Sequence, residues 1–196
     1  MNNLLAIDPA THGTAGGLFI KGVLVAAAYC KNKINEGDIV HRCAHSAMAV
    51  GEWAKGVLYH HPDTEEYASV DLIVVELPQI YSRGQNKTKG DPNKTCLPLA
   101  MVDGALAALF PYAQTFSHQP HSWKGTTEKP KRSYDENGKE AVYVIKKRVV
   151  DRLTPAEQRT IEWGKNVERT WDIADAIGVG LHHLGRFERA RVFARE

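Results

Sequence analysis

Residues 171–186 have the sequence WDIADAIGVGLHHLGR, and this stretch decides which fold the chain is expected to adopt. It predicts a helix over residues 170–184 whose small residues, among them an alanine and two glycines, allow its backbone to approach a sheet closely. Helical positions three apart project to the same side, so Asp172 and Asp175 share one face of this helix. Two carboxylates on one face can hold one hard cation.

Two apolar segments earlier in the chain each end at an acidic residue. Residues 4–7 form a short apolar run that stops at Asp8, which a proline follows. Residues 71–76, DLIVVE, form the clearest strand of the sequence and end at Glu76. Carboxylates at the ends of two buried strands and on a closely packed helix are the donors that Mg²⁺ prefers. Two such ions can stabilise both the attacking and the leaving oxygen in phosphodiester cleavage.

The remaining elements complete a mixed α/β domain. Strands over residues 16–20 and 23–30, joined by a tight turn at Lys21 and Gly22, are expected to form an antiparallel meander with the first strand. The polar, basic segment 82–95 is expected to be a surface loop. We also expect helices over residues 38–58, 98–110 and 141–153, a strand over residues 113–116, and a short helix that starts at the capping box of residues 154–157.

Composition narrows the class of protein. With 196 residues, 43% of them hydrophobic, the chain is expected to form a single domain over residues 1–196, with a polar insertion at about residues 125–140. The formal net charge is only +2, so any nucleic-acid surface must be local. Three cysteines without paired spacing indicate neither a disulfide framework nor a zinc site. The sequence has neither a signal-peptide pattern nor an apolar stretch of roughly 18 residues, so we expect a soluble cytoplasmic protein without a membrane partner.

These residues resemble the RuvC-type Holliday-junction resolvases, particularly their phage-encoded relatives, within the RNase H-like superfamily. The resemblance covers nearly the whole chain. It rests on LLAIDP (4–9), VVELPQIY (74–81), SWKG (122–125) with the lysine-rich stretch after it, and WDIADAIGVGLHHLGR (171–186). It implies an α/β fold with an RNase H-like mixed five-stranded sheet flanked by helices.

The resemblance also implies roles for individual residues. The metal-binding acids would be Asp8, Glu76, Asp172 and Asp175, which would bind two Mg²⁺ or Mn²⁺ ions per active site. Lys124 matches a basic residue near the scissile phosphate, whereas Trp123 beside it is expected to be a core or rim aromatic. Tyr81 is a loose match to an aromatic that meets bases at the junction. Phosphate contacts are expected from the basic residues Arg83, Lys87, Lys89, Lys94, Lys124, Lys131 and Arg132.

The expected function is a Mg²⁺- or Mn²⁺-dependent endonuclease that cuts branched DNA, four-way junctions in particular. It would act as a homodimer whose apolar contact is residues 98–110. Another RNase H-like nuclease, of the terminase or RNA–DNA hybrid type, and a non-catalytic DNA-binding relative are the alternatives. Sugar kinases and actin-like ATPases need two such domains and glycine-rich phosphate loops, for which this chain is too short. The sequence does not decide whether His182 or His183 joins the active site.

Overall fold

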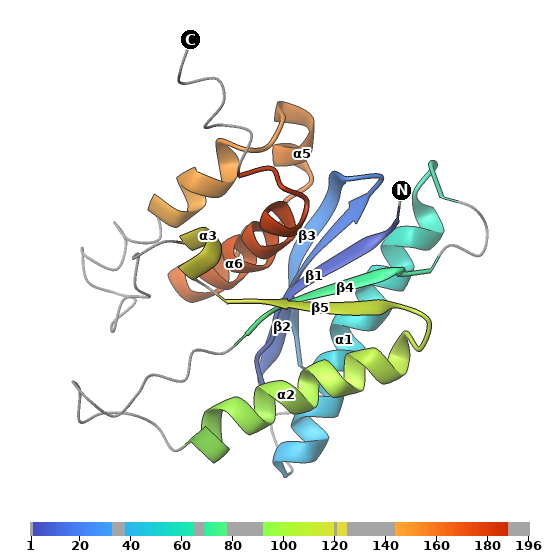
Figure 1. Cartoon of the computed structure of the whole chain (residues 1–196), viewed down its shortest axis with the longest axis vertical. Coiled ribbons are helices and arrows are strands. Elements are labelled where there is room, and N and C mark those ends of the chain that lie inside the picture. The colour runs from blue at the N-terminus through green and yellow to red at the C-terminus, as the bar shows by residue number, and fades with distance from the viewer. Residues whose placement is uncertain are drawn as a thin grey trace.

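One mixed sheet organises the chain. A computed structural model describes residues 2–32, 38–64, 69–77, 92–119, 121–124 and 144–187, and for residues 92–95, 121 and 124 it describes the backbone alone. Five strands lie in the order β3-β2-β1-β4-β5, and helices cover both faces of the sheet (Figure 1). The strands are β1 (Leu4–Asp8), β2 (Gly13–Ile20), β3 (Val23–Lys31), β4 (Leu72–Glu76) and β5 (Gln114–His118). The helices are α1 (Ile39–His60), α2 (Pro92–Leu109), α3 (His121–Lys124), α5 (Pro155–Arg159) and α6 (Val167–His183), and residues 144–150 are also helical.

The first three strands form the predicted antiparallel meander. β2 pairs antiparallel with β1 and with β3. The turn between β2 and β3 has positive φ angles at Lys21 (52°) and Gly22 (81°), the backbone conformation that a two-residue hairpin turn requires. β4 and β5 continue the sheet in parallel on the other side of β1. The predicted mixed sheet flanked by helices is therefore confirmed.

Alternation along the central strands separates two hydrophobic cores. On β1, Leu4 and Ala6 pack in the core that contains α6, whereas Leu5 and Ile7 pack in the core that contains α1 and α2. Side chains of a regular strand point alternately to the two faces of its sheet, so a regular β1 places these residues in the two cores in turn. Both faces of β1 are covered, which explains why its sequence is continuously apolar rather than alternating.

The helix α6 lies very close to the sheet because it carries glycine at the contact. A Cβ atom on Gly180 would lie 2.4 Å from the ring of Phe19 and 2.9 Å from the Cβ of Ala6. Any larger residue would push the helix away from β1 and β2. The predicted close approach of this helix to the sheet is thus confirmed at Gly180.

Several predicted boundaries were wrong. The predicted helix over residues 98–110 begins earlier, at Pro92, so the last residues of the predicted loop 82–95 are helical instead. Pro98, the first residue of the predicted helix, lies inside α2. The fifth strand extends to His118, two residues beyond its predicted end. None of the described helices is long and apolar enough to cross a membrane.

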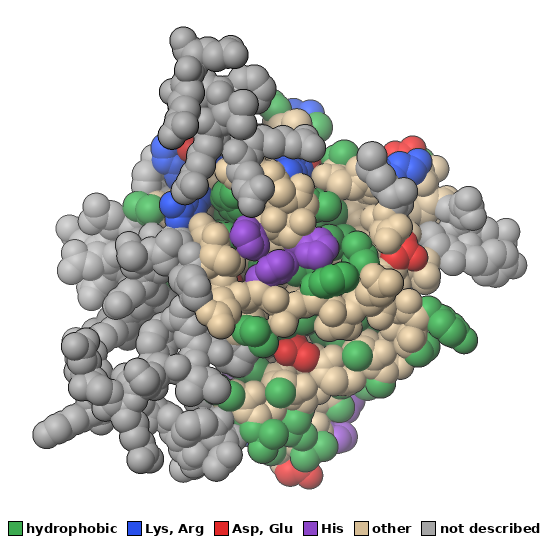
Figure 2. All heavy atoms as spheres, in the orientation of Figure 1, with side chains coloured by type: hydrophobic (Ala, Val, Ile, Leu, Met, Phe, Trp, Pro, Cys, Tyr) green, Lys and Arg blue, Asp and Glu red, His purple; other side chains and the backbone are tan. Residues whose placement is uncertain are grey.

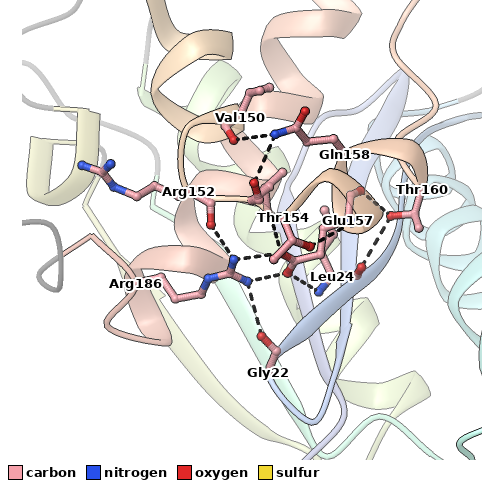
Figure 3. A network of polar contacts seen from close by, with 10 residues as sticks. Gly22, Leu24, Val150, Arg152, Thr154, Glu157, Gln158, Thr160 and Arg186 are labelled. Atoms are coloured by element: carbon pink, nitrogen blue, oxygen red, sulfur yellow. Dashed lines mark hydrogen bonds and ion pairs between the residues drawn. The ribbon is translucent and has the colours of Figure 1, made fainter.

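An ion pair between Glu157 and Arg186 connects elements near the C-terminal end of the described chain. The predicted capping box is present at the start of α5, where the Thr154 side chain accepts from the Glu157 backbone and the Glu157 side chain accepts from the Thr154 backbone. The Glu157 carboxylate also accepts from the backbone N–H of Leu24 on β3, at 3.0 Å, and from the guanidinium of Arg186 (Figure 3). These bonds connect α5, the edge strand β3 and the segment after α6.

Candidate active site

Asp8 and Glu76 lie side by side at one end of the sheet. β1 and β4 are parallel neighbours, and Ile7 pairs with Val75, so the next residue of each strand lies at the same level. Neighbouring strands are about 4.8 Å apart. Ala6 and Val74 belong to the core on the α6 face, and the residues two positions further along, Asp8 and Glu76, point to that same face.

The helix α6 carries the other two predicted acids and packs on this face. It packs across β1, β2 and β4, and its N-terminus is capped by Asn166, whose side chain accepts from the Arg169 backbone. Asp175 is 2% exposed and Glu76 is 8% exposed, whereas Asp8 and Asp172 are half-buried. The predicted carboxylates therefore come from two strand ends and one helix that share a face of the sheet.

The chemistry of this donor set fits a hard divalent cation, because all four groups are carboxylates. Burying carboxylates such as Asp175 and Glu76 is costly unless hydrogen bonds or a cation compensate their charge. Within the described ranges, however, no group of three or more His, Cys, Asp or Glu side chains is arranged to hold a metal ion. Joint ligation by the four acids therefore stays a prediction.

Trp123 connects the short helix α3 to the acids. Its indole Nε1 donates to Oε2 of Glu76 at 3.3 Å, and its side chain is 4% exposed, which confirms the prediction of a core aromatic. Its carbonyl oxygen accepts from Nη1 of Arg148 at 3.2 Å. These contacts fix the backbone just before Lys124 next to the carboxyl end of β4. The side chain of Lys124 itself lies outside the described part of the structure.

Histidines gather beside the same end of the sheet, on the face seen in Figure 2. His118 ends β5 and pairs in register with Glu76, and its Nε2 lies 3.1 Å from Nδ1 of His183. The His182 ring is also adjacent, with its centroid 4.9 Å from that of His118. Burial, with the nearby His182 and His183, lowers the pKa of His118, and burial with His182 lowers the pKa of His183. Both rings are therefore mainly neutral near neutral pH.

The sequence pointed to His182 and His183 but missed His118. A lone histidine carries no pattern of its own. The one available signal was its position at the end of a parallel strand, the same signal that identified Glu76.

Most of the predicted DNA-binding residues lie outside the described residues. This applies to Tyr81, Arg83, Lys87, Lys89, Lys131 and Arg132. Lys94 lies in α2, where only its backbone is described. The contacts of these residues with DNA stay predictions.

The mixed five-stranded sheet flanked by helices is the RNase H-like fold of the RuvC-type nucleases. The chain is similar to a solved structure of Thermus thermophilus RuvC, with 16% identity, 96% of each chain covered and a TM-score of 0.52. It is equally similar to T. thermophilus RuvC in complex with a Holliday junction substrate, with 16% identity, 97% and 96% coverage and a TM-score of 0.51. The yeast mitochondrial Holliday junction resolvase shares 15% identity over 97% of this chain and 82% of its own, with a TM-score of 0.51. Neither a protein-family model nor a curated protein sequence matches the chain.

Proposed function

We propose that this protein is a divalent-metal-dependent endonuclease that cleaves branched DNA, with four-way junctions as its preferred substrate. The observation that carries the proposal is the pair Asp8 and Glu76 at level ends of adjacent parallel strands, on the sheet face against which α6 carries Asp172 and Asp175. The branched substrate is supported by the fold, which the chain shares with a RuvC solved on a Holliday junction substrate.

In the proposed reaction, the four acids would hold two Mg²⁺ or Mn²⁺ ions. Such ions, when bound, supply an activated water molecule for attack on phosphorus and stabilise the departing 3′ oxygen. The protein contributes a fixed arrangement of carboxylates. Glu76 is held at a strand end by the sheet ladder and by Trp123, and the burial of Asp175 restricts access of bulk water to the α6 side of the site. Lys124, at the end of α3, would contact the phosphate.

The proposed homodimer would use the outer surface of α2. Val102, Leu106 and Phe110 of the expected contact segment are buried against the rest of their own chain, in the core shared with α1. They are therefore not available to a second copy. Leu97 is 56% exposed and lies on the outward side of the same helix. An isologous contact between two copies of α2 would match the two-fold symmetry of a four-way junction.

The function is tested by incubating the purified chain with labelled four-way junction, flap, linear duplex and RNA–DNA hybrid, with Mg²⁺ or with a chelator. We expect Mg²⁺-dependent cleavage of the junction well above that of linear duplex. Preferential cleavage of the hybrid would instead support the RNase H-type alternative. Tight junction binding without cleavage in Mg²⁺ or Mn²⁺ would support a non-catalytic relative.

A further inference from the structure

The indole of Trp123 packs against α6 in a space that Gly178 leaves open. A Cβ atom on Gly178 would lie 2.3 Å from the Trp123 ring, so the ring can lie there only because residue 178 is glycine. On another side, the ring of Phe187 stacks against it with a centroid separation of 5.9 Å and an interplanar angle of 26°. The Trp123 carbonyl is held by Arg148. A four-residue helix is therefore anchored by one deeply buried side chain.

In this position the indole N–H of Trp123 points toward the carboxylate of Glu76. Nε1 of Trp123 lies 3.3 Å from Oε2 of Glu76, and the two side chains come from positions 47 residues apart in the chain. A hydrogen bond to a charged acceptor is stronger than a neutral one, and a buried setting strengthens it further. A carboxylate has about four lone-pair sites, so accepting one indole N–H is compatible with binding a cation as well.

We infer that Trp123 is a positioning residue that orients the Glu76 carboxylate for metal binding, an inference that rests on the proposed function. An indole does not titrate at ordinary pH and takes no part in proton transfer. Its contribution is to hold one oxygen of Glu76 so that the other is presented at the end of β4. Residues that hydrogen-bond to metal ligands in this way typically affect metal affinity by about 10- to 100-fold.

The test removes the N–H and keeps the shape. Trp123 is replaced in the full chain by 3-benzothienylalanine, whose sulfur stands where indole has its N–H. The Mn²⁺ dissociation constant is measured by calorimetry without DNA, together with the melting temperature of the metal-free protein. We expect the dissociation constant to rise about tenfold or more while the melting temperature stays near that of the natural chain. Trp123→Phe should weaken Mn²⁺ binding similarly but also lower the melting temperature, because it leaves a cavity.

Two matched controls separate this effect from general packing. The same replacement at Trp53, which lies on α1 against Gly16 on the opposite face of the sheet, should leave Mn²⁺ affinity unchanged. Gly178→Ala should displace the Trp123 ring and weaken Mn²⁺ binding. Gly104→Ala, whose added Cβ would meet nothing within 4 Å, should not.

Glu76→Gln provides the reference that separates the inference from the proposed function. Unchanged Mn²⁺ affinity in the benzothienyl variant, with affinity lost in Glu76→Gln, would overturn the inference and leave the metal site standing. Undiminished affinity in Glu76→Gln would remove the metal site at Glu76 and the inference with it.

Discussion

Glu157 and Glu76 are both almost fully buried, at 2% and 8% exposure, but their carboxylates have different surroundings. Glu157 accepts from two backbone N–H groups and from the Arg186 guanidinium (Figure 3). Burial alone would raise its pKa, but the hydrogen bonds from Arg186, Leu24 and Thr154 together lower the pKa of Glu157 to about 2. Its charge is therefore compensated within the fold.

Glu76 instead accepts from an indole N–H and lies beside Asp8 at one end of the sheet, on the face that α6 covers. Carboxylates that converge on one region repel one another unless a proton or a cation joins them. The comparison teaches that two carboxylates with nearly equal burial can have different hydrogen-bond partners, so burial alone does not distinguish them. The partners differ: the carboxylate of Glu157 is paired with the guanidinium of Arg186, whereas the carboxylate of Glu76 accepts from the indole N–H of Trp123.

The largest expected effect is on cleavage. Glu76→Gln keeps the shape of the side chain but removes its charge, so junction cleavage in Mg²⁺ should fall about a thousandfold or more, with DNA binding retained. Glu157→Gln is the matched control, because the same change at the other buried glutamate should leave cleavage per folded molecule near normal. Rates are compared under single-turnover conditions, with folding checked by circular dichroism. Equal losses of cleavage in the two variants would show that Glu76 has no role in cleavage that Glu157 lacks.

The next largest effect is on the free energy of unfolding, and it is expected from the change at Glu157. Glu157→Gln leaves the charge of Arg186, whose side chain is 19% exposed, without its carboxylate, and should cost about 3–5 kcal/mol in the free energy of unfolding. Asp151→Asn, in the exposed ion pair with Lys147, should cost less than about 1 kcal/mol. Denaturant unfolding measures both changes.

The pH dependence of Glu157 provides a check on that result. Its pKa in the folded protein, about 2, lies below the ordinary value of 4.5, so its contribution is complete above pH 4.5 and is lost as pH falls toward 2. The Glu157→Gln variant should lack this part of the acid dependence. Parallel stability curves for both proteins between pH 5 and pH 2 would contradict the assignment.

A smaller effect is expected at Asp103 on α2, a third carboxylate withdrawn from solvent. Among the described residues, its Oδ1 is buried without a hydrogen-bond partner, and burial raises the pKa of Asp103 to about 7. A raised pKa means that stability is highest below the ordinary value of 3.8 and is lost as pH rises through 7. Asp103→Asn should therefore gain little at pH 4 and about 2 kcal/mol at pH 8, roughly half of what the full pKa shift would give, because Asp103 is only half-buried. Urea unfolding at the two pH values measures this, and an equal gain at both would show that ionisation of Asp103 is not the cause.

The sequence predicted what depends on neighbours along the chain. Apolar runs that end at Asp8 and Glu76 placed both acids at strand ends, and the capping box at Thr154 placed the start of α5. Contacts between distant positions left no such pattern. The capping box showed the local role of Glu157 but not its pairing with Arg186, 29 residues away.

The same limit applied at the candidate site. Trp123 was expected to be a core or rim aromatic. Nothing in the sequence indicated that its indole N–H would donate to Glu76. The start of α2 was missed because its first residues, from Pro92, lie in the polar, basic segment that was predicted to be a loop. Local patterns therefore predicted the acids, and the fold added the groups that surround them.

The central claim is that carboxylates on two strand ends and on α6 together hold divalent cations for DNA cleavage. The most direct measurement determines, on one preparation, the Mn²⁺-induced rise in melting temperature and the rate of junction cleavage for the natural chain and for Asp175→Asn. The account predicts a variant that folds, is as stable as the natural chain or slightly more stable without metal because one repelling charge is gone, and loses both cleavage and most of the Mn²⁺ shift. Full cleavage with an undiminished Mn²⁺ shift, or a variant that does not fold, would contradict it.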